Sequence, residues 1–160
     1  MTLAFLKSAP GAEPVIVEGL IAAPVSRVYR AWTDPEDIGN WFGLKPGGPV
    51  SAKIDLRVGG RWRFVMSEEA DQRSVLEGEY LRIEQDRCLA FTWRHVRESG
   101  DGTRDTTAPS QVTVTFWAEG AATHMHLRHE GIVQEDGRRG VGHGWEATFG
   151  HLTDWLASGG

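Results

Sequence analysis

The chain has 160 residues, of which 40% are hydrophobic and 24% charged, and these values are typical of a soluble globular protein with one domain. The formal net charge of −5 argues against nucleic-acid binding, because phosphate recognition needs a basic surface. The single cysteine, Cys88, excludes an internal disulfide, and we expect an inert, partly buried thiol. No apolar run reaches the roughly 20 residues of a membrane span, and Lys7 interrupts the apolar start of the chain, unlike a signal peptide. We therefore expect a cytoplasmic protein.

The first part of the chain predicts one strand and two short helices. Residues 1–13 show no hydrophobic period, so we expect a flexible lead, followed by one domain over residues 14–158. The β-branched segment Pro14–Ala22 predicts the first strand. Pro24 is suited to the first turn of a helix, and a second short helix is expected to begin after the capping residue Asp34.

From residue 61 onward the hydrophobic period changes to two, which is typical of half-buried antiparallel strands. Five runs show this alternation, and they span residues 61–66, 76–80, 89–95, 112–117 and 123–129. The segment Ala118–Ala122 predicts a tight hairpin between the last two runs. Polar or glycine-rich composition predicts loops at residues 43–49, 97–110 and 134–140.

The last segment, "GHGWEATFGHLTDWL", predicts a helix over Gly142–Leu156. Trp145, Phe149, Leu152 and Leu156 are separated by four, three and four residues, so they form one stripe along that helix. The apolar face of an antiparallel sheet and the apolar stripe of a helix are both removed from water when they pack against each other. The order of elements therefore predicts a two-layer α+β fold.

Five segments occur in an order that resembles a known family. They are "IAAPVSRVYRAWTDPEDIGNWF", "DLRVGGRWRF", "LEGEYLRIEQDRCLAFTW", "VTVTFWAEGAATHMHLRHEG" and "GHGWEATFGHLTDWL". Over about residues 15–156 the chain resembles homologues of the heat-shock protein 90 ATPase activator, of the bacterial single-domain type, in the START-like, helix-grip superfamily (SRPBCC). The resemblance implies a curved antiparallel sheet of about six to seven strands wrapped on a long C-terminal helix, with two short helices after the first strand. It also implies a cavity between that helix and the sheet.

The side chains that these periods turn inward are mostly aromatic. With two residues of the second short helix that could cover the open end, the candidate cavity-lining set is Trp41, Phe42, Trp62, Phe64, Met66, Tyr80, Phe91, Trp93, His95, Phe116, Met125, Leu127, His129, Trp145 and Phe149. These side chains either form a solid aromatic core or line an apolar pocket in which a few polar groups orient a ligand. The residues alone favour the core, whereas the resemblance favours the pocket.

Three members of this set are polar, namely Tyr80, His95 and His129. Buried tyrosine and histidine side chains usually hydrogen-bond to the backbone, and the alternative is that these three orient a ligand. Catalysis by a histidine would need a paired group, and Glu130, the neighbour of His129, points to the other face of its strand. We therefore assign no catalytic residue and no cofactor.

Three other motifs are better explained by structure than by chemistry. His124 and His126 share an outward strand face, with no nearby cysteine or acidic residue in the sequence to complete a ligand set, so no metal site is predicted. Gly59-Gly60 precedes a strand rather than a helix, which fits a turn or bulge better than a phosphate loop. Arg138 and Arg139 could lie near a cavity mouth, where they would favour an anionic ligand.

The function favoured by these observations is binding of a small hydrophobic or aromatic molecule, without catalysis. An enzyme of the cyclase or hydrolase kind is the alternative, and it would need a polar cluster inside the cavity. A co-chaperone that binds the heat-shock ATPase comes last, because the eukaryotic activators carry an additional N-terminal domain and only thirteen residues precede the first expected strand here. We expect neither a nucleic acid nor a membrane as partner, and a homodimer is left open.

Overall fold

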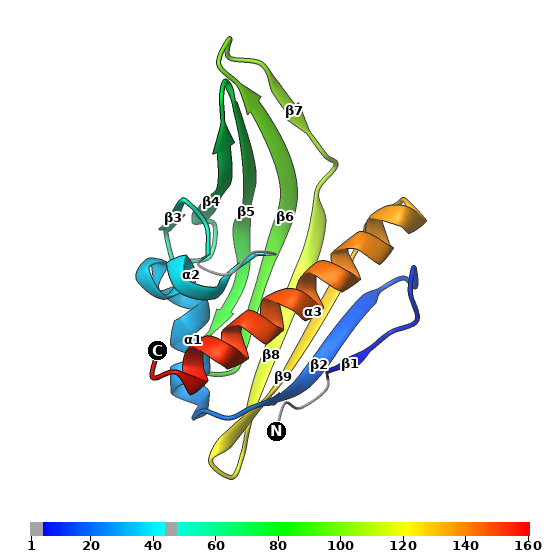
Figure 1. Cartoon of the computed structure of the whole chain (residues 1–160). Helices are drawn as coiled ribbons and strands as arrows, with labels where there is room; N and C mark the ends of the chain where they lie inside the picture. Colours follow the sequence, from blue (N-terminus) through cyan, green and yellow to red (C-terminus); the bar gives the residue numbers. More distant parts are fainter. Residues whose placement is uncertain (1–4, 44–47) are drawn as a thin grey trace.

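A computed structural model describes residues 5–43 and 48–160 of the chain. In these residues, three helices and one antiparallel sheet of nine strands are present (Figure 1). The strands follow the order β1-β2-β9-β8-β6-β5-β4-β3 across the sheet, and β7 pairs with β6. This arrangement confirms the α+β helix-grip fold, with more strands than the six to seven expected.

The bounds of the elements are β1 Leu6–Lys7, β2 Val15–Ile21, α1 Val25–Thr33, α2 Pro35–Trp41, β3 Ser51–Ile54, β4 Arg61–Glu69, β5 Gln72–Glu84, β6 Cys88–Ser99, β7 Arg104–Thr106, β8 Ser110–Glu119, β9 Ala122–Glu130 and α3 Glu135–Ala157. The predicted order of one strand, two short helices, a run of antiparallel strands and a last helix is therefore confirmed. The expected hairpin at Ala118–Ala122 is also confirmed, because β8 ends and β9 begins within it.

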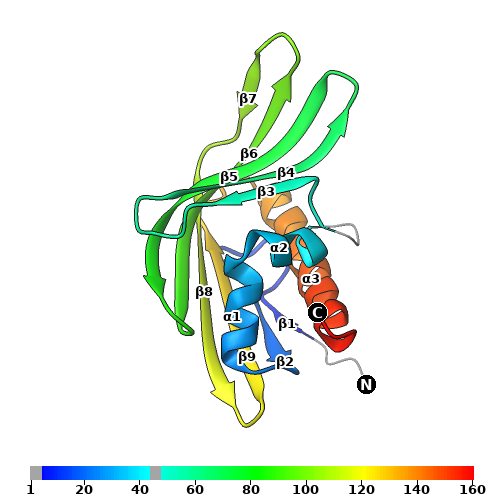
Figure 2. The same ribbon diagram turned by 90° about the vertical axis from the view of Figure 1, so that its left-hand side faces the viewer.

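The sheet is bent, and all three helices lie on its concave side (Figure 2). Helix α3 crosses in front of β8, β9 and β2, while the far ends of β4–β7 project beyond it (Figure 1). Helices α1 and α2 pack beside the carboxyl-terminal part of α3. The concave face is therefore covered closely along part of its length and less closely near the projecting strand ends.

Local sequence explains why the two short helices form where they do. The side chain of Asp34 accepts a hydrogen bond from the backbone N–H of Glu36 over 2.9 Å, and Pro35 occupies the first turn of α2. Trp41 at the end of α2 is fully buried and donates its indole N–H to the carbonyl of Ala31 in α1 over 3.0 Å. This bond and the shared burial fix the two helices against each other.

Trp32 of α1 lies at the centre of an aromatic core. Its ring centroid is 5.0 Å from that of Trp41, 6.0 Å from that of Trp145 and 6.3 Å from that of Phe149. Such pairs contribute beyond the area that they bury. Trp145, Phe149 and Leu152 are all buried, so the expected stripe of α3 does face the sheet.

The predicted loop at residues 134–140 is wrong, because α3 already begins at Glu135. Glycines in this segment lower its intrinsic helix propensity, so the sequence pattern does not predict a helix here. Tertiary contacts compensate for this, since Arg138 donates hydrogen bonds to the carbonyls of Gly11, Ile132 and Val133 at 2.7, 2.9 and 2.9 Å. The acidic Glu135 and Asp136 in the first turn also favour the positive end of the helix dipole.

The predicted loop at residues 97–110 is correct only in part, because only residues 100–103 and 107–109 connect strands. Strand β6 extends to Ser99, and Arg104–Thr106 pairs with it as β7. The side chains of β7 are exposed throughout, so no apolar alternation marks this strand.

Strands β1 and β3 were not expected either, and β1 places two residues of the N-terminal lead against β2. Of the expected loop at residues 43–49 and of the lead, residues 44–47 and 1–4 lie outside the described residues.

The turn at Gly59-Gly60 matches the sequence-based prediction. Gly59 has a φ of 85°, in the left-handed region that favours glycine, and it links β3 to β4.

In the described ranges, no helix combines the length and the apolarity needed to cross a membrane.

Candidate functional site

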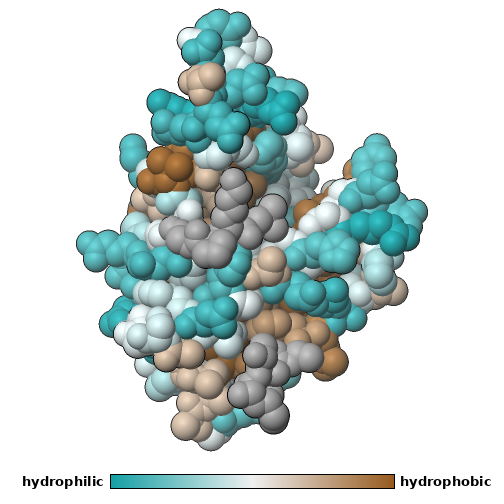
Figure 3. All heavy atoms as spheres, viewed as in Figure 1, coloured by the Kyte–Doolittle hydropathy of each residue, from teal (hydrophilic) through white to brown (hydrophobic). Residues whose placement is uncertain are grey.

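A pocket of about 520 Å³ lies between the amino-terminal half of α3 and the sheet strands β4–β6. Its lining consists of Phe42, Gly43, Gly48, Met66, Ser67, Glu69, Ser74, Leu76, Trp93, His95, Gly140, Val141, Gly144, Trp145 and Thr148. Figure 3 shows the molecular surface hollowed between the projecting ends of the strands and the start of α3. The volume falls within the range of small-molecule binding sites.

Small residues on α3 keep this space open. Gly140, Gly144 and Thr148 follow one another at intervals of four and therefore lie on one face of the helix. A methyl group built onto Gly140 would meet no atom within 4 Å, apart from its chain neighbours and the helix backbone. The helix backbone thus forms part of the pocket wall, and larger side chains at these positions would occupy the pocket.

A bulge in β4 shapes the opposite wall. Val65 pairs with Val75 and Ser67 with Ser74, so β4 uses one more residue than β5 between these pairs. The extra residue is Met66, and the bulge lets both Met66 and Ser67 line the pocket. Beyond the bulge, the inward set of β4 is therefore Ser67 and Glu69 rather than a continuation of the aromatic alternation.

Three aromatic rings form one wall of the pocket. The ring centroids of Trp93 and Trp145 are 5.0 Å apart at an interplanar angle of 50°. The ring of Phe42 lies 5.8 Å from Trp145 and 6.3 Å from Trp93. A wall of flat rings suits a flat apolar ligand, because the ligand gains from removing its faces from water.

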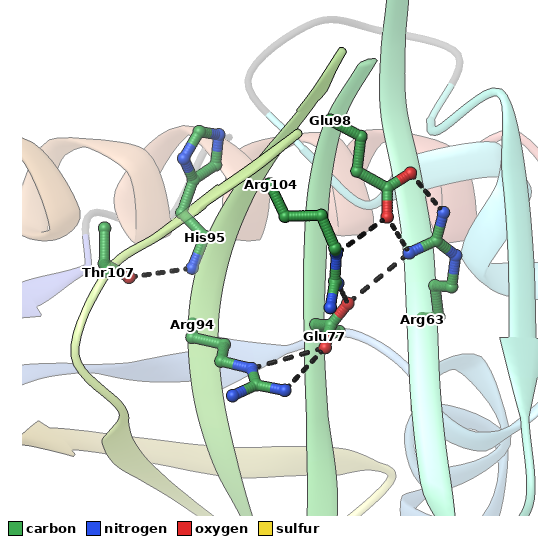
Figure 4. Close-up of polar contacts among 7 residues, drawn as sticks. All are labelled: Arg63, Glu77, Arg94, His95, Glu98, Arg104 and Thr107. Atoms are coloured by element: carbon green, nitrogen blue, oxygen red, sulfur yellow. Dashed lines mark hydrogen bonds and ion pairs between the residues drawn. The ribbon is translucent and has the colours of Figure 1, made fainter. Parts of the chain in front are cut away.

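The main polar contact in the pocket joins β5 and β6. Ser74 Oγ lies 2.7 Å from His95 Nε2. The backbone N–H of His95 donates to Thr107 Oγ1 over 3.0 Å (Figure 4). The carbonyl of His95 accepts from the Thr107 N–H, also over 3.0 Å. Partial burial, with a contribution from Arg97, lowers the pKa of His95 below its ordinary value, so the imidazole is neutral at neutral pH.

His129 lies behind this pocket in the core. It is fully buried, accepts the indole N–H of Trp145 at Nδ1 over 3.0 Å, and has Ser110 Oγ 2.7 Å from Nε2. Because Nδ1 accepts, the proton of the neutral ring sits on Nε2 and is donated to Ser110, whose hydroxyl donates to the Trp93 carbonyl over 3.3 Å. Burial lowers the pKa of His129 to about 3. This buried histidine is linked to both tryptophans of the pocket wall.

The structure divides the fifteen predicted cavity-lining residues into two groups. Those that line the pocket are Phe42, Met66, Trp93, His95 and Trp145. Those that lie elsewhere in the packed interior are Trp41, Trp62, Phe64, Tyr80, Phe91, Phe116, Met125, Leu127, His129 and Phe149. Several of the second group surround a void of only about 10 Å³, the size of one water molecule. The concave face therefore combines a packed aromatic core with an open pocket, and five of the fifteen residues line that pocket.

Most of the polar lining was missed. Ser74 lies two residues before Leu76 in the alternating run of β5, so extending the period by one step would have found it. Ser67 and Glu69 could not be found in this way, because the bulge at Met66 reverses the alternation. Gly140 fell in a segment that was expected to be a loop.

The outward histidines have an acidic neighbour that the sequence did not reveal. Glu18 of β2 lies 3.5 Å from His124 and 3.4 Å from His126, because β2 pairs with β9. Even so, the described residues contain no group of three or more His, Cys, Asp or Glu side chains arranged to hold a metal.

Cys88 is buried, and burial raises the pKa of its thiol.

Arg138 and Arg139 do not line the pocket. The guanidinium group of Arg138 donates hydrogen bonds to three backbone carbonyls, and that of Arg139 forms an ion pair with Glu135 over 2.9 Å. They flank a separate space of about 20 Å³ beside the N-terminal segment. Neither guanidinium group therefore supports the alternative in which these residues favour an anionic ligand in the pocket.

The outer face of β4–β7 carries a network of charged side chains. Arg63, Arg94 and Arg104 surround Glu77, and Arg63 and Arg104 also contact Glu98 (Figure 4). Arg63 and Glu98 approach to 2.7 Å, and Arg94 and Glu77 to 2.9 Å. Each of the five side chains contacts at least one side chain of opposite charge, so the network links adjacent strands.

Solved structures with the same fold include CalU16 from Micromonospora echinospora, at 27% identity and a TM-score of 0.65, over 94% of this chain and 84% of CalU16. MLL2253 from Mesorhizobium loti has 24% identity and a TM-score of 0.72, over 91% of this chain and 97% of MLL2253. DynU16, a protein in the dynemicin biosynthetic locus, has 21% identity and a TM-score of 0.73. That match covers 92% of this chain but 48% of DynU16, so this chain spans about half of its length. No curated protein matches the chain.

One family's sequence model matches residues 22–157, the part of the chain that contains all three helices and the sheet from β3 to β9. The match agrees with the helix-grip arrangement of sheet and α3 described above. The chain belongs to the Activator of Hsp90 ATPase homolog 1-like protein family.

Proposed function

We propose that the protein binds a small, mainly apolar and aromatic molecule in the pocket between α3 and β4–β6. The observation that carries this proposal is the pocket itself, which has about 520 Å³ of space beside a wall of three aromatic rings. Elsewhere in the described part of the concave face, the side chains around Trp62 and Phe91 leave a void of only about 10 Å³. A folded chain that keeps glycines where larger side chains would fit gains no packing energy there, which suggests that a ligand fills the space.

The expected driving force is the removal of apolar area from water. A ligand that buries about 200 Å² of apolar surface gains about 5 kcal/mol at about 25 cal/mol for each Å². Part of this gain is lost to the cost of immobilising the ligand. Affinity should therefore rise with the apolar area of the ligand until the pocket is filled.

The comparisons support a role with small organic molecules in general terms. DynU16 is described as a protein of a biosynthetic locus, and such loci handle small molecules. An enzyme of the cyclase kind is a second candidate, favoured by the neutral imidazole of His95 in the pocket. The family description refers to activation of the Hsp90 ATPase, but the pocket gives no argument for that role and we do not propose it.

A pair of matched glycine substitutions tests the proposal. Gly140 lines the pocket and Gly150 does not, although both lie on α3 and an added methyl group would clash with nothing at either position. The probe is N-phenyl-1-naphthylamine, an uncharged aromatic compound whose fluorescence rises in apolar surroundings. We expect Gly140→Leu to weaken its binding about tenfold or more, equivalent to about 1.4 kcal/mol, and Gly150→Leu to leave it unchanged.

Thermal melting of both variants shows whether they remain folded. Absence of probe binding to the unmodified protein would refute the proposal. Equal weakening by the two substitutions would also refute it, because the probe would then bind outside the pocket. Turnover of a bound compound, rather than its unchanged release, would favour the cyclase candidate.

A further inference from the structure

We infer that Ser74 and His95 form a polar subsite that receives an uncharged oxygen of the ligand, a hydroxyl or a carbonyl. This inference rests on the proposed function, because it concerns the same pocket. It names the class of ligand more narrowly: an aromatic body with one neutral hydrogen-bonding oxygen, rather than a pure hydrocarbon or a carboxylate.

The first argument is placement. On β5 and β6, Leu76 pairs with His95 and Ser74 pairs with Arg97, so Ser74 and His95 are diagonal neighbours on the inner face of the sheet. Both are only partly buried and both line the pocket, next to the ring of Trp93. A ligand lying against the aromatic wall would therefore have its edge within reach of this pair.

The second argument is that two other polar groups of the lining, on Trp145 and Thr148, already have partners. The Trp145 N–H is held by His129, and the hydroxyl of Thr148 donates to backbone carbonyls of Gly144 and Gly43 at 2.7 and 3.2 Å. Ser74 and His95 bond to each other through Oγ and Nε2. A serine hydroxyl and a neutral imidazole together have more donors and acceptors than one mutual bond consumes.

The third argument is that this pair adapts to either kind of oxygen. With the proton on Nε2, the imidazole donates to Ser74 Oγ, and the serine hydroxyl is free to donate to a ligand carbonyl. With the proton on Nδ1, Nε2 accepts from Ser74, and the lone pairs of Oγ accept from a ligand hydroxyl. Either state leaves a neutral site.

The fourth argument is electrostatic. Glu69 also lines the pocket, and its negative charge opposes an anionic ligand there. Arg97 and Asp105 act on His95 in opposite senses, while burial favours its neutral form. The two hydrogen bonds to Thr107 hold the strand of His95 in place, so little reorganisation is needed when a ligand binds.

Three matched compounds test the subsite: naphthalene, 2-naphthol and 2-naphthoate, whose dissociation constants are measured with the intact protein. One neutral hydrogen bond should make 2-naphthol bind about three- to tenfold more tightly than naphthalene, and 2-naphthoate should bind more weakly than 2-naphthol. Ser74→Ala and, independently, His95→Leu should reduce the preference for 2-naphthol to less than about twofold while naphthalene still binds. Ser51→Ala is the control, because Ser51 is exposed on the neighbouring strand β3, does not line the pocket, and should keep the preference.

The outcomes separate the two claims. If naphthalene and 2-naphthol both fail to bind, the proposed function is wrong. If naphthalene binds and 2-naphthol binds no more tightly, the pocket stands and the subsite is wrong. Preference that survives both Ser74→Ala and His95→Leu, or is lost equally in Ser51→Ala, would place the polar contact elsewhere. Binding of 2-naphthoate as tight as that of 2-naphthol would overturn the assignment to a neutral oxygen.

Discussion

Trp145 donates its indole N–H to Nδ1 of the fully buried His129 over 3.0 Å. This bond joins a ring of the pocket wall to the interior of the sheet, and the Nε2–Ser110 contact continues the chain of bonds to the carbonyl of Trp93. Both tryptophans of the wall are thus tied to one buried histidine. In such a chain, loss of one member leaves its neighbours buried without partners.

Replacement of His129 by leucine should therefore destabilise the protein by about 2–3 kcal/mol, because the Trp145 N–H and the Ser110 hydroxyl lose their partners. Urea denaturation monitored by circular dichroism gives the change in the free energy of unfolding. His126→Leu is the control, since His126 lies on the same strand but turns outward. A loss no larger than that of the control would contradict the account of this bond.

Acid should destabilise the protein through the same residue. Burial lowers the pKa of His129 from 6.5 to about 3, so between these values the unfolded chain binds a proton that the folded protein does not. The free energy of unfolding should therefore fall as pH decreases through this window, by at most about 1.4 kcal/mol for each pH unit. Urea titrations across the window should show a shallower slope in His129→Leu. An unchanged slope would mean that His129 is protonated in the folded state.

Phe149 should behave as a core residue rather than a pocket residue. Its side chain is fully buried, lies 5.4 Å from the ring of Phe5, and does not line the pocket. Phe149→Ala should cost about 3–5 kcal/mol of stability. The ratio of the affinities for 2-naphthol and naphthalene should stay the same, as measured at a temperature where the variant is folded. A small loss of stability together with a changed ratio would show that the pocket extends to this ring.

The network on the outer face gives a fourth prediction. Glu77 is mostly buried: burial alone would raise its pKa, but the guanidinium groups of Arg94 and Arg104 lower it overall from 4.5. Glu77→Gln should cost about 2 kcal/mol at pH values above the ordinary pKa of 4.5. The loss should shrink as the pH falls from 4.5 through the lowered pKa of the folded protein, because the original carboxylate is then protonated too. Glu79→Gln, on the same strand face but exposed, should have little effect. Equal effects of the two substitutions would show that the network adds no stability.

The sequence predicted the fold where apolar periodicity was strong. The inward sets of β4, β6, β8 and β9 and the stripe of α3 follow from alternation and helical spacing, because burial of one face imposes those periods. Strand β7 and the first turns of α3 were missed because their stability comes from strand pairing and from the contacts of Arg138. Such contacts depend on residues far apart in the sequence.

The pocket was harder to predict than the fold. Whether an inward ring meets a neighbour or open space depends on the opposing residue, and Gly140 and Gly144 are identified as that opposing surface only once α3 is placed. The bulge at Met66 then adds Ser67 and Glu69 to the lining. Tyr80 and His129 were sensible candidates for ligand contacts, but both lie outside the lining of the pocket.

A crystal structure of the protein grown with 2-naphthol tests the central claim most directly. The account predicts density for one ring system against Trp93 and Trp145, with its oxygen within hydrogen-bonding distance of Ser74 or His95. Density for the compound at any other place on the protein, or an empty pocket at a concentration that saturates binding in solution, would contradict the account.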